Sequence, residues 1–149
     1  MQTLKTFAAL AFAALLTACA ATGPKMAEIS AAIPAVKTGE ARVYVYRNSS
    51  LVGAAMQPDV LVNGRVAGSS KPGGFFFVDV KPGPVEISTS TEIEKKLTFT
   101  AEAGQARYVR TVIGLGLVVG RVYPELVDNA EGAKEIADTS YIGAPLAAR

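Results

Sequence analysis

The sequence predicts a mainly β fold, an antiparallel β-sandwich or a small barrel, over most of its 149 residues. Short segments alternate apolar and polar side chains with a period of two, which is typical of strands with one buried face. Turn-forming sequences rich in Gly, Pro, Asn and Asp separate these segments, and such short connections favour antiparallel pairing between neighbours. Helical patterns are short and lie near the two ends of the chain.

The chain opens with a segment typical of a secretory signal. Lys5 precedes the uncharged run from Thr6 to Leu16, which is far shorter than the roughly 20 apolar residues that a membrane-spanning helix needs. Leu16-Thr17-Ala18-Cys19 follows and matches a lipobox. We therefore expect cleavage after Ala18 and acylation of Cys19 with chains such as palmitate, and two or more chains give stable membrane attachment.

Ordinary secretory cleavage after Ala20 is the alternative, because Ala18-Cys19-Ala20 also matches the small-x-small pattern of signal peptides. That cleavage would release a soluble protein. The chain has a single Cys, and it stands where a lipobox requires it, which favours lipidation. The residue directly after Cys19 is Ala20 and not an acidic residue, and by the sorting rule of Gram-negative lipoproteins this favours the periplasmic side of the outer membrane.

Composition shifts divide the chain into four parts: a signal peptide at 1–18, a lipidated flexible tether at 19–39, a β-sandwich domain at 40–139 and a loosely ordered tail at 140–149. The tether is Ala-rich and interrupted by Pro and Gly, as linkers are. The alternative for this part is that Ile29, Ile33 and Val36 form a docking strip for a partner.

The charge of the mature chain argues against nucleic acid as a partner. Removing Lys5 with the leader leaves 14 of the 15 basic residues against 13 acidic ones. Nucleic-acid binding needs a basic stripe that displaces counterions, and a nearly neutral chain lacks that excess.

Several segments of the domain have strand character. In the first, Val43 and Val45 share one face while Tyr44 and Tyr46 share the other. Glu92 to Lys96 is expected to form a charged hairpin tip. The expected strands are 42–47, 60–67 as a hairpin, 75–80, 85–90, 97–101, 107–113 and 121–127.

The hairpin at 60–67 has the clearest turn signal, because Asn63-Gly64 favours a type I′ turn between antiparallel strands. This turn places Leu61 opposite Val66. In the strand at 75–80 the alternation directs Asp79 to the face opposite Phe76, and we expect this carboxylate to face water.

The run from Gly114 to Gly120 alternates glycines with large apolar residues. It is too short for a membrane-spanning helix and lacks the spacing of a nucleotide loop. As a strand it would place Gly114, Gly116 and Gly120 on one nearly bare face. Internal packing under Phe75, Phe77 or tyrosine rings is one interpretation; the other is an exposed edge for self-association or a partner strand.

A short helix is expected over residues 131–137, capped by Asp128 or Asn129 and weakened by Gly132. Before it, Pro124 marks an edge or a bend of the last strand.

Several short motifs together resemble a known family: Arg-x-Tyr-x-Tyr-Arg at 42–47, the Val-Asn-Gly turn at 62–64, the Phe-rich strand closed by Lys81-Pro82-Gly83, and Ala-Glu-Ala-Gly at 101–104 before an aromatic strand. Over residues 40–138 the chain resembles an uncharacterised bacterial lipoprotein family, domain of unknown function 2846, whose members often carry a lipobox. The resemblance implies an Ig-like or carboxypeptidase-regulatory-like sandwich and brings no catalytic residues. The glycine run at 114–120 departs from the family pattern.

The residue types that are missing exclude common catalytic and metal sites. The chain has no His and one Cys, at the lipidation position, which excludes Ser-His-Asp, Cys-His and His- or Cys-based zinc sites. Ser69-Ser70-Lys71 lacks the Ser-x-x-Lys spacing of a Ser-Lys pair. Glu92 and Glu94 lie beside two lysines, as on a screened hairpin tip. We expect neither enzymatic activity nor a cofactor or metal.

The function that follows is a non-enzymatic, outer-membrane-anchored periplasmic lipoprotein, a structural or adaptor module of the cell envelope. Its partners would be the membrane through Cys19 and a protein or second copy through the Gly114–Gly120 strand. The alternative is a module that binds cell-wall glycan or another anion through arginine forks; a hydrolase is the third reading. The candidate ligand-binding residues are Arg42, Arg47, Arg107 and Arg110.

Overall fold

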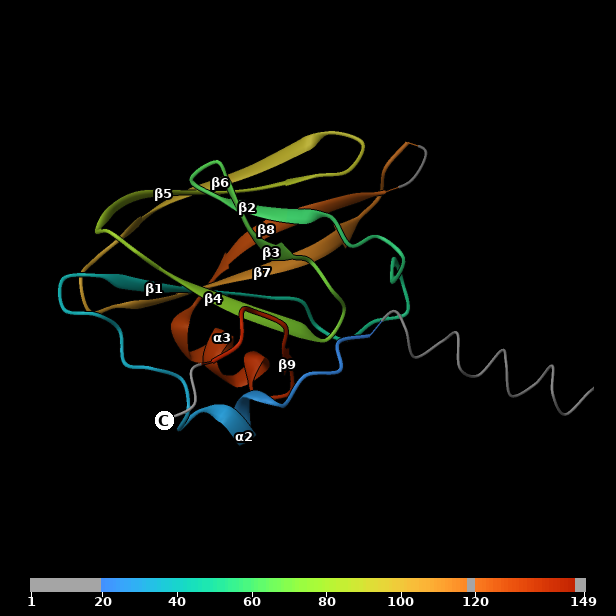
Figure 1. Cartoon of the computed structure of the whole chain (residues 1–149). Coiled ribbons are helices and arrows are strands. Elements are labelled where there is room, and N and C mark those ends of the chain that lie inside the picture. The colour runs from blue at the N-terminus through green and yellow to red at the C-terminus, as the bar shows by residue number, and fades with distance from the viewer. Residues whose placement is uncertain (1–19, 118–119, 147–149) are drawn as a thin grey trace, which may run out of the picture.

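The computed structural model describes residues 20–117 and 120–146, which form two packed β-sheets with short helices outside them (Figure 1). The predicted signal peptide and Cys19 lie outside the described residues. The elements in chain order are α2 (Met26–Ile29), β1 (Ala41–Tyr46), β2 (Asp59–Val62), β3 (Arg65–Ser69), β4 (Gly74–Val80), β5 (Gly83–Ser90), β6 (Glu94–Ala101), β7 (Ala106–Gly114), β8 (Arg121–Val127), α3 (Asn129–Ile136) and β9 (Ser140–Tyr141). The predicted mainly β, sandwich-like fold is confirmed.

One sheet has the strand order β8-β7-β1-β4-β9 and the other β3-β2-β5-β6. The sequence neighbours β2–β3, β5–β6 and β7–β8 pair antiparallel, as short connections require. The central strand β1 pairs antiparallel with β4 but parallel with β7, far along the chain. The connections β1–β2, β3–β4, β4–β5 and β6–β7 cross from one sheet to the other, whereas α3 joins β8 to β9 within the five-stranded sheet.

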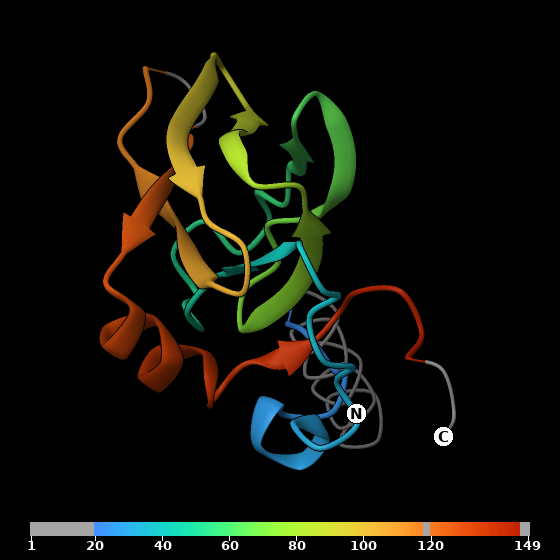
Figure 2. The same cartoon turned by 90° about the vertical axis from the view of Figure 1, so that its left-hand side faces the viewer.

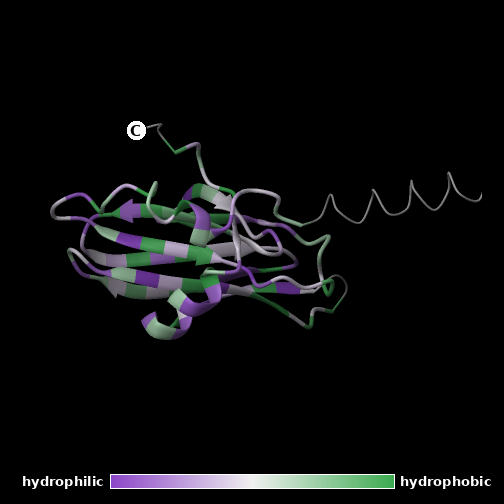
Figure 3. Cartoon of the chain, turned by 90° about the horizontal axis from the view of Figure 1, so that it is seen from below, coloured by the Kyte–Doolittle hydropathy of each residue, from purple (hydrophilic) through white to green (hydrophobic). Residues whose placement is uncertain are grey.

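The main core lies between the two sheets and follows the predicted alternation. The first strand directs Val43 and Val45 inward, where they are almost fully buried. Figure 3 shows the corresponding alternation of hydrophobic and hydrophilic residues along the strands. The other buried members of this core are Ala41, Val60, Val62, Phe76, Val85, Ile87, Phe99, Ala101 and Val109.

A second, aromatic core covers the outer face of the five-stranded sheet. Tyr44 stacks on Tyr108 with ring centres 5.1 Å apart and planes 12° apart. Figure 2 shows α3, β9 and the N-terminal segment gathered on this side. Both faces of the sheet are therefore buried. The members of this core are Tyr44, Tyr46, Phe75 and Ile136, with Met26, Ile29, Ile33, Phe77, Ala106, Tyr108 and Tyr141 packed around them.

The prediction of a flexible tether at 19–39 is wrong for much of this stretch. The Ala21 N–H donates to the Pro72 carbonyl at 3.0 Å. Ile29 and Ile33, two members of the predicted docking strip, pack on the aromatic core of their own domain. The apolar outer face of the sheet gives this Ala-rich segment a surface to bury, which its composition alone did not indicate.

The prediction of a loosely ordered tail from residue 140 is also wrong, because Ser140 and Tyr141 form β9 beside β4. The Tyr141 ring lies 5.3 Å from the Phe75 ring. The Tyr141 N–H donates to the Pro24 carbonyl at 2.8 Å, and an isolated bridge joins Lys25 to Ser140. The domain therefore extends beyond 40–139 at both ends.

Helix α3 begins two residues before the predicted start. The Asp128 carboxylate accepts the Ala130 N–H at 2.9 Å, so the predicted cap at Asp128 is confirmed. Gly132 faces the sheet, and a methyl group there would lie 2.4 Å from Tyr108 Cβ. The glycine that weakens the helix thus permits its close approach to β7.

Candidate functional site

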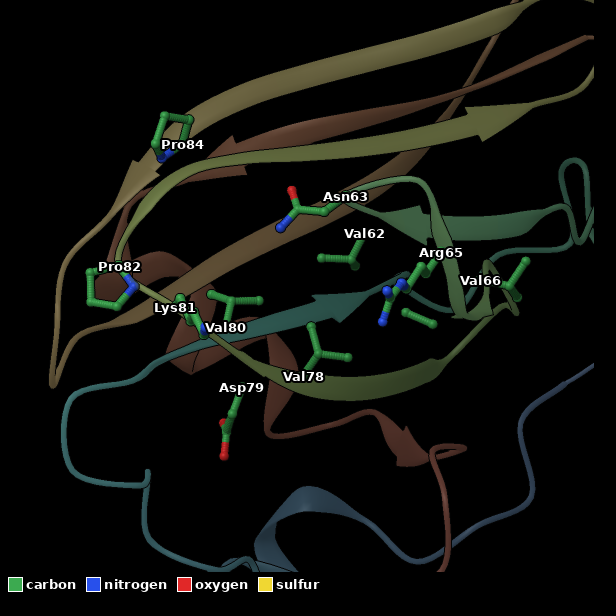
Figure 4. A pocket seen from close by; sticks show the side chains of 11 residues that line it. Val62, Asn63, Arg65, Val66, Val78, Asp79, Val80, Lys81, Pro82 and Pro84 are labelled. Atoms are coloured by element: carbon green, nitrogen blue, oxygen red, sulfur yellow. The ribbon is translucent and has the colours of Figure 1, made fainter.

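An open groove of roughly 580 Å³ lies along one side of the sandwich. Figure 4 shows Val62, Val78 and Val80 around its apolar floor. The polar side chains at the groove include Asn63, Arg65 and Lys81.

The groove lies between an edge of β3 and an edge of β4. Neither edge pairs with a further strand at the groove. β3 is the last strand of its sheet, and β9 pairs with β4 only at Gly74 and Phe75. The remainder of β4, from Phe76 to Val80, has one edge without a strand partner, and Gly68 of β3 lies against the Phe76 ring.

The predicted Asn63-Gly64 hairpin closes one end of this groove. Asn63 and Gly64 have φ values of 49° and 76°, as a type I′ turn requires. Leu61 lies opposite Val66, as predicted, and a bulge follows at Val60. The Asn63 side-chain oxygen accepts the Glu86 N–H at 2.9 Å, which fixes the turn to the neighbouring strand.

The groove offers an apolar floor, one guanidinium and one ammonium group. Asn63 and Asp79 are the other polar residues among its 11 lining residues. The apolar floor and the two cations are chemically suited to contact with an extended or anionic ligand.

Asp79 lines the groove but turns its carboxylate away from it, as Figure 4 shows. The expectation that it faces water is wrong. Its two oxygens accept Nε and Nη2 of Arg42 at 2.7 and 2.8 Å, a bidentate ion pair. Arg42 Nη1 also donates to the Pro34 carbonyl at 2.6 Å, and its guanidinium lies 4.2 Å from the Phe77 ring centre. The hydrogen bond to Asp79 raises the pKa of Arg42.

Arg47, the second candidate ligand-binding residue, is 3% exposed and is held by backbone carbonyls. Its Nη1 donates to Met56 at 2.6 Å and to Ser70 at 3.2 Å. Its Nη2 donates to Gly53 at 2.8 Å and to Val52 at 3.4 Å. Burial lowers the pKa of Arg47. The side chain fastens the loop between β1 and β2.

Arg110 is held by acidic residues of α3. Its Nη1 lies 2.9 Å from carboxylate oxygens of both Glu131 and Glu135. Burial opposes its charge, but these carboxylates raise the pKa of Arg110 above its ordinary value. Burial acts to raise the pKa of Glu135, yet hydrogen bonds from Tyr46, at 2.6 Å, and from Arg110 lower it.

Arg107 lines a shallow hollow of roughly 220 Å³ beside Leu126 and Asp128, and its guanidinium lies 5.8 Å from the Phe99 ring centre. The four candidate arginines therefore do not form a common site, since each has different neighbours. The sequence did not predict that Arg65 and Lys81 line the groove. Each residue stands beside a turn, and no local pattern indicates that the two turns lie close together.

The glycine run does not continue the sheet as predicted. β7 ends at Gly114 and β8 begins at Arg121. The Tyr123 ring covers Gly114, so close that a methyl group there would lie 2.2 Å from Cε2. Gly116 faces Gly120, and Gly120 lies against Met56. Neighbouring residues therefore cover the three glycines that were candidates for an exposed interface. At Gly114 the structure agrees with the other prediction, internal packing under a tyrosine ring.

The two groups weighed as catalytic candidates, Ser70 of the Ser-Lys pair and the carboxylates of Glu92 and Glu94, have partners within the protein. The Ser70 hydroxyl is buried and lies 2.8 Å from the Thr111 hydroxyl. Glu92 accepts the Leu117 N–H at 2.9 Å, whereas Glu94 lies 3.6 Å from Lys96. Within 20–117 and 120–146, no three His, Cys, Asp or Glu side chains gather as metal ligands do. None of the helices in those ranges is long and apolar enough to span a membrane.

Comparison with known proteins gives two matches. A family model described as a protein of unknown function, DUF2846, matches residues 37–122. An uncharacterized protein of Haemophilus influenzae is 31% identical over 129 residues, which cover 84% of this chain and 76% of that protein. No solved structure matches the chain.

Proposed function

This chain belongs to the DUF2846 family of proteins of unknown function, and from that premise we propose that it is a non-enzymatic lipoprotein of the bacterial outer membrane. In this proposal the sandwich is a structural or adaptor module on the periplasmic side, anchored by acyl chains on Cys19. The family resemblance predicted from the motifs at 42–104 is confirmed.

The observation that carries the proposal is the position of the single cysteine. Cys19 ends the lipobox and stands two residues before Ala21, whose N–H is already bonded to the domain. An acyl chain on Cys19 would therefore attach a folded module to the bilayer almost directly.

The engagement of three of the candidate arginines supports an adaptor rather than a module that binds an anion through them. Arg42 donates hydrogen bonds to Asp79, Arg47 donates to backbone carbonyls, and Arg110 donates to carboxylates of α3. Side chains used in this way stabilise the fold and do not meet a substrate.

The anchor is tested with the full-length chain and a Cys19→Ser control, grown with radiolabelled palmitate. We expect label in the wild type, none in the control, and co-sedimentation of the wild type with outer-membrane fractions on a sucrose gradient. An unlabelled wild type whose mature N-terminus is Ala21 would contradict the proposal.

The adaptor role is tested by cross-linking in intact cells, followed by purification and mass spectrometry. We expect a recurrent envelope protein in the cross-linked product of the wild type and its loss in Cys19→Ser, because the module would leave its membrane. Turnover of a small-molecule substrate by the purified protein would contradict the non-enzymatic part of the proposal.

A second candidate function is favoured by the groove between β3 and β4. Its apolar floor and its two cations, Arg65 and Lys81, suit an anionic cell-wall glycan or a similar ligand. A pull-down on purified peptidoglycan tests it, with Arg65→Ala/Lys81→Ala as the variant and Arg107→Ala, outside the groove, as the control. Equal retention of all three proteins would exclude the groove as the binding site.

A further inference from the structure

Exposed apolar side chains gather at one end of the sandwich. Of the seven large apolar residues that are exposed among the described ones, five lie in the loop between β1 and β2, the β5–β6 turn and the β7–β8 loop. Figure 1 shows these loops at the end where the described chain begins. We call these five side chains the apolar end: Leu51 (89% exposed), Val52 (72%), Ile93 (44%), Leu115 (96%) and Leu117 (90%).

The three loops of the apolar end are packed against one another. Gly53 lies against Ile113, and Gly120 lies against Met56. Glu92 accepts the N–H of Leu117 at 2.9 Å. These contacts hold the loops together, while the five side chains of the apolar end stay exposed.

The N-terminal segment joins the domain at this same end. The Ala21 N–H donates to the Pro72 carbonyl, and the neighbouring Gly73 lies against Ser49 of the β1–β2 loop. Cys19 is two residues away, and two residues of extended chain span at most about 7 Å. A lipid on Cys19 therefore brings this end of the sandwich to the bilayer surface.

We propose that the apolar end is a membrane-contact surface, whose five side chains enter the interfacial layer of the bilayer that holds Cys19. This inference rests on the lipid anchor of the proposed function. The acyl chains alone leave the domain free to swing about Cys19, whereas apolar loop tips in the interface fix its orientation. The groove between β3 and β4 then runs along the side of the domain and stays accessible from the periplasm.

The five side chains of the apolar end carry no charge. Arg121 Nε lies 3.5 Å from Glu92 beside the loops, so this cation already has an acidic neighbour within the protein. We therefore expect insertion to be similar in vesicles of phosphatidylcholine and in vesicles that also contain phosphatidylglycerol.

The chain contains no Trp, so a single introduced indole reports its own depth in the membrane. The test uses full-length protein purified from membranes and reconstituted into vesicles whose phospholipids carry brominated acyl chains. The variants are Leu117→Trp and Leu51→Trp at the apolar end. The matched control is Ala103→Trp, an exposed position in the β6–β7 turn at the opposite end of the sandwich.

We expect at least a twofold loss of Trp fluorescence by bromine quenching and a blue shift for both leucine variants, with no quenching of the control. Equal fluorescence of all three in vesicles that float with the protein would overturn the membrane contact and leave the anchor intact. The same result with a concentration-dependent dimer in solution would assign the surface to a second copy. If the wild type neither carries acyl chains nor floats with vesicles, the anchor and the contact both fail.

Discussion

Replacement of Arg47 by methionine tests whether this buried arginine is a structural element or a ligand-binding residue. Methionine keeps an apolar stem of similar length but removes the two nitrogens that bond the carbonyls of Met56 and Gly53 at 2.6 and 2.8 Å. It also removes the longer contacts to Ser70 and Val52.

Hydrogen bonds that involve a charged group contribute about 1.5–3 kcal/mol each, so the two short ones give a gross loss of about 3–6 kcal/mol. Two effects reduce this loss. A buried guanidinium carries a desolvation cost that methionine lacks, and the carbonyls of a surface loop regain water when the loop loosens. We expect a net loss of about 2–4 kcal/mol in the free energy of unfolding, a large part of the roughly 5–15 kcal/mol of an ordinary domain.

Urea unfolding followed by circular dichroism measures this loss. The control is Arg65→Met, an exposed arginine of the groove, for which we expect a change within about 0.5 kcal/mol. Limited proteolysis gives a second measurement, because the loop at 47–58 should be cleaved faster in Arg47→Met. An Arg47→Met protein as stable as the wild type, with an unaltered cleavage rate, would refute the structural role of Arg47.

Three further substitutions test other contacts. Gly132→Ala should lower Tm even though alanine favours a helix by about 1 kcal/mol, because its methyl group meets Tyr108 and overpacking costs about 1–3 kcal/mol; a raised Tm contradicts this. Asp79→Asn should lower the free energy of unfolding, measured with urea, by about 2–4 kcal/mol, because Arg42 stays buried without its carboxylate partner. An unchanged urea midpoint would exclude this role of the Arg42–Asp79 ion pair. Glu135→Gln should be less stable than wild type at pH 7, by a margin that narrows as the pH falls from 7 to 3. The folded-state pKa of Glu135 lies below the ordinary value of about 4.3, so its stabilising effect is present above that value and is lost as the pH falls through the folded-state pKa. A constant difference between pH 7 and pH 3, measured by urea unfolding, argues against it.

The elements that depend on local sequence could be predicted. The Asn63-Gly64 turn fixed the register of Leu61 and Val66, and Asp128 capped its helix. Both signals act over a few residues, through backbone conformation and side-chain hydrogen bonds.

The features that depend on distant segments could not be predicted. The pairing of Arg42 with Asp79 follows from the β1–β4 register, which no local pattern sets. The outer face of the five-stranded sheet is buried by α2, α3 and β9, so Tyr44 and Tyr46 gave no sign of which face meets solvent. The glycine run alternates as a strand does, but Leu115 and Leu117 lie exposed in a loop.

If the chain is exported as proposed above, the seam between its two ends sets a condition on its folding. Residues 24–26 bond to residues 139–141, through the Lys25–Ser140 bridge and the bonds on either side of it. A polypeptide that crosses a membrane N-terminus first cannot close this seam until its last strand has emerged. Because contacts so far apart in sequence form slowly, the emerging chain leaves its aromatic outer face uncovered for a time. A chaperone that shields this face during translocation would raise the yield of folded protein.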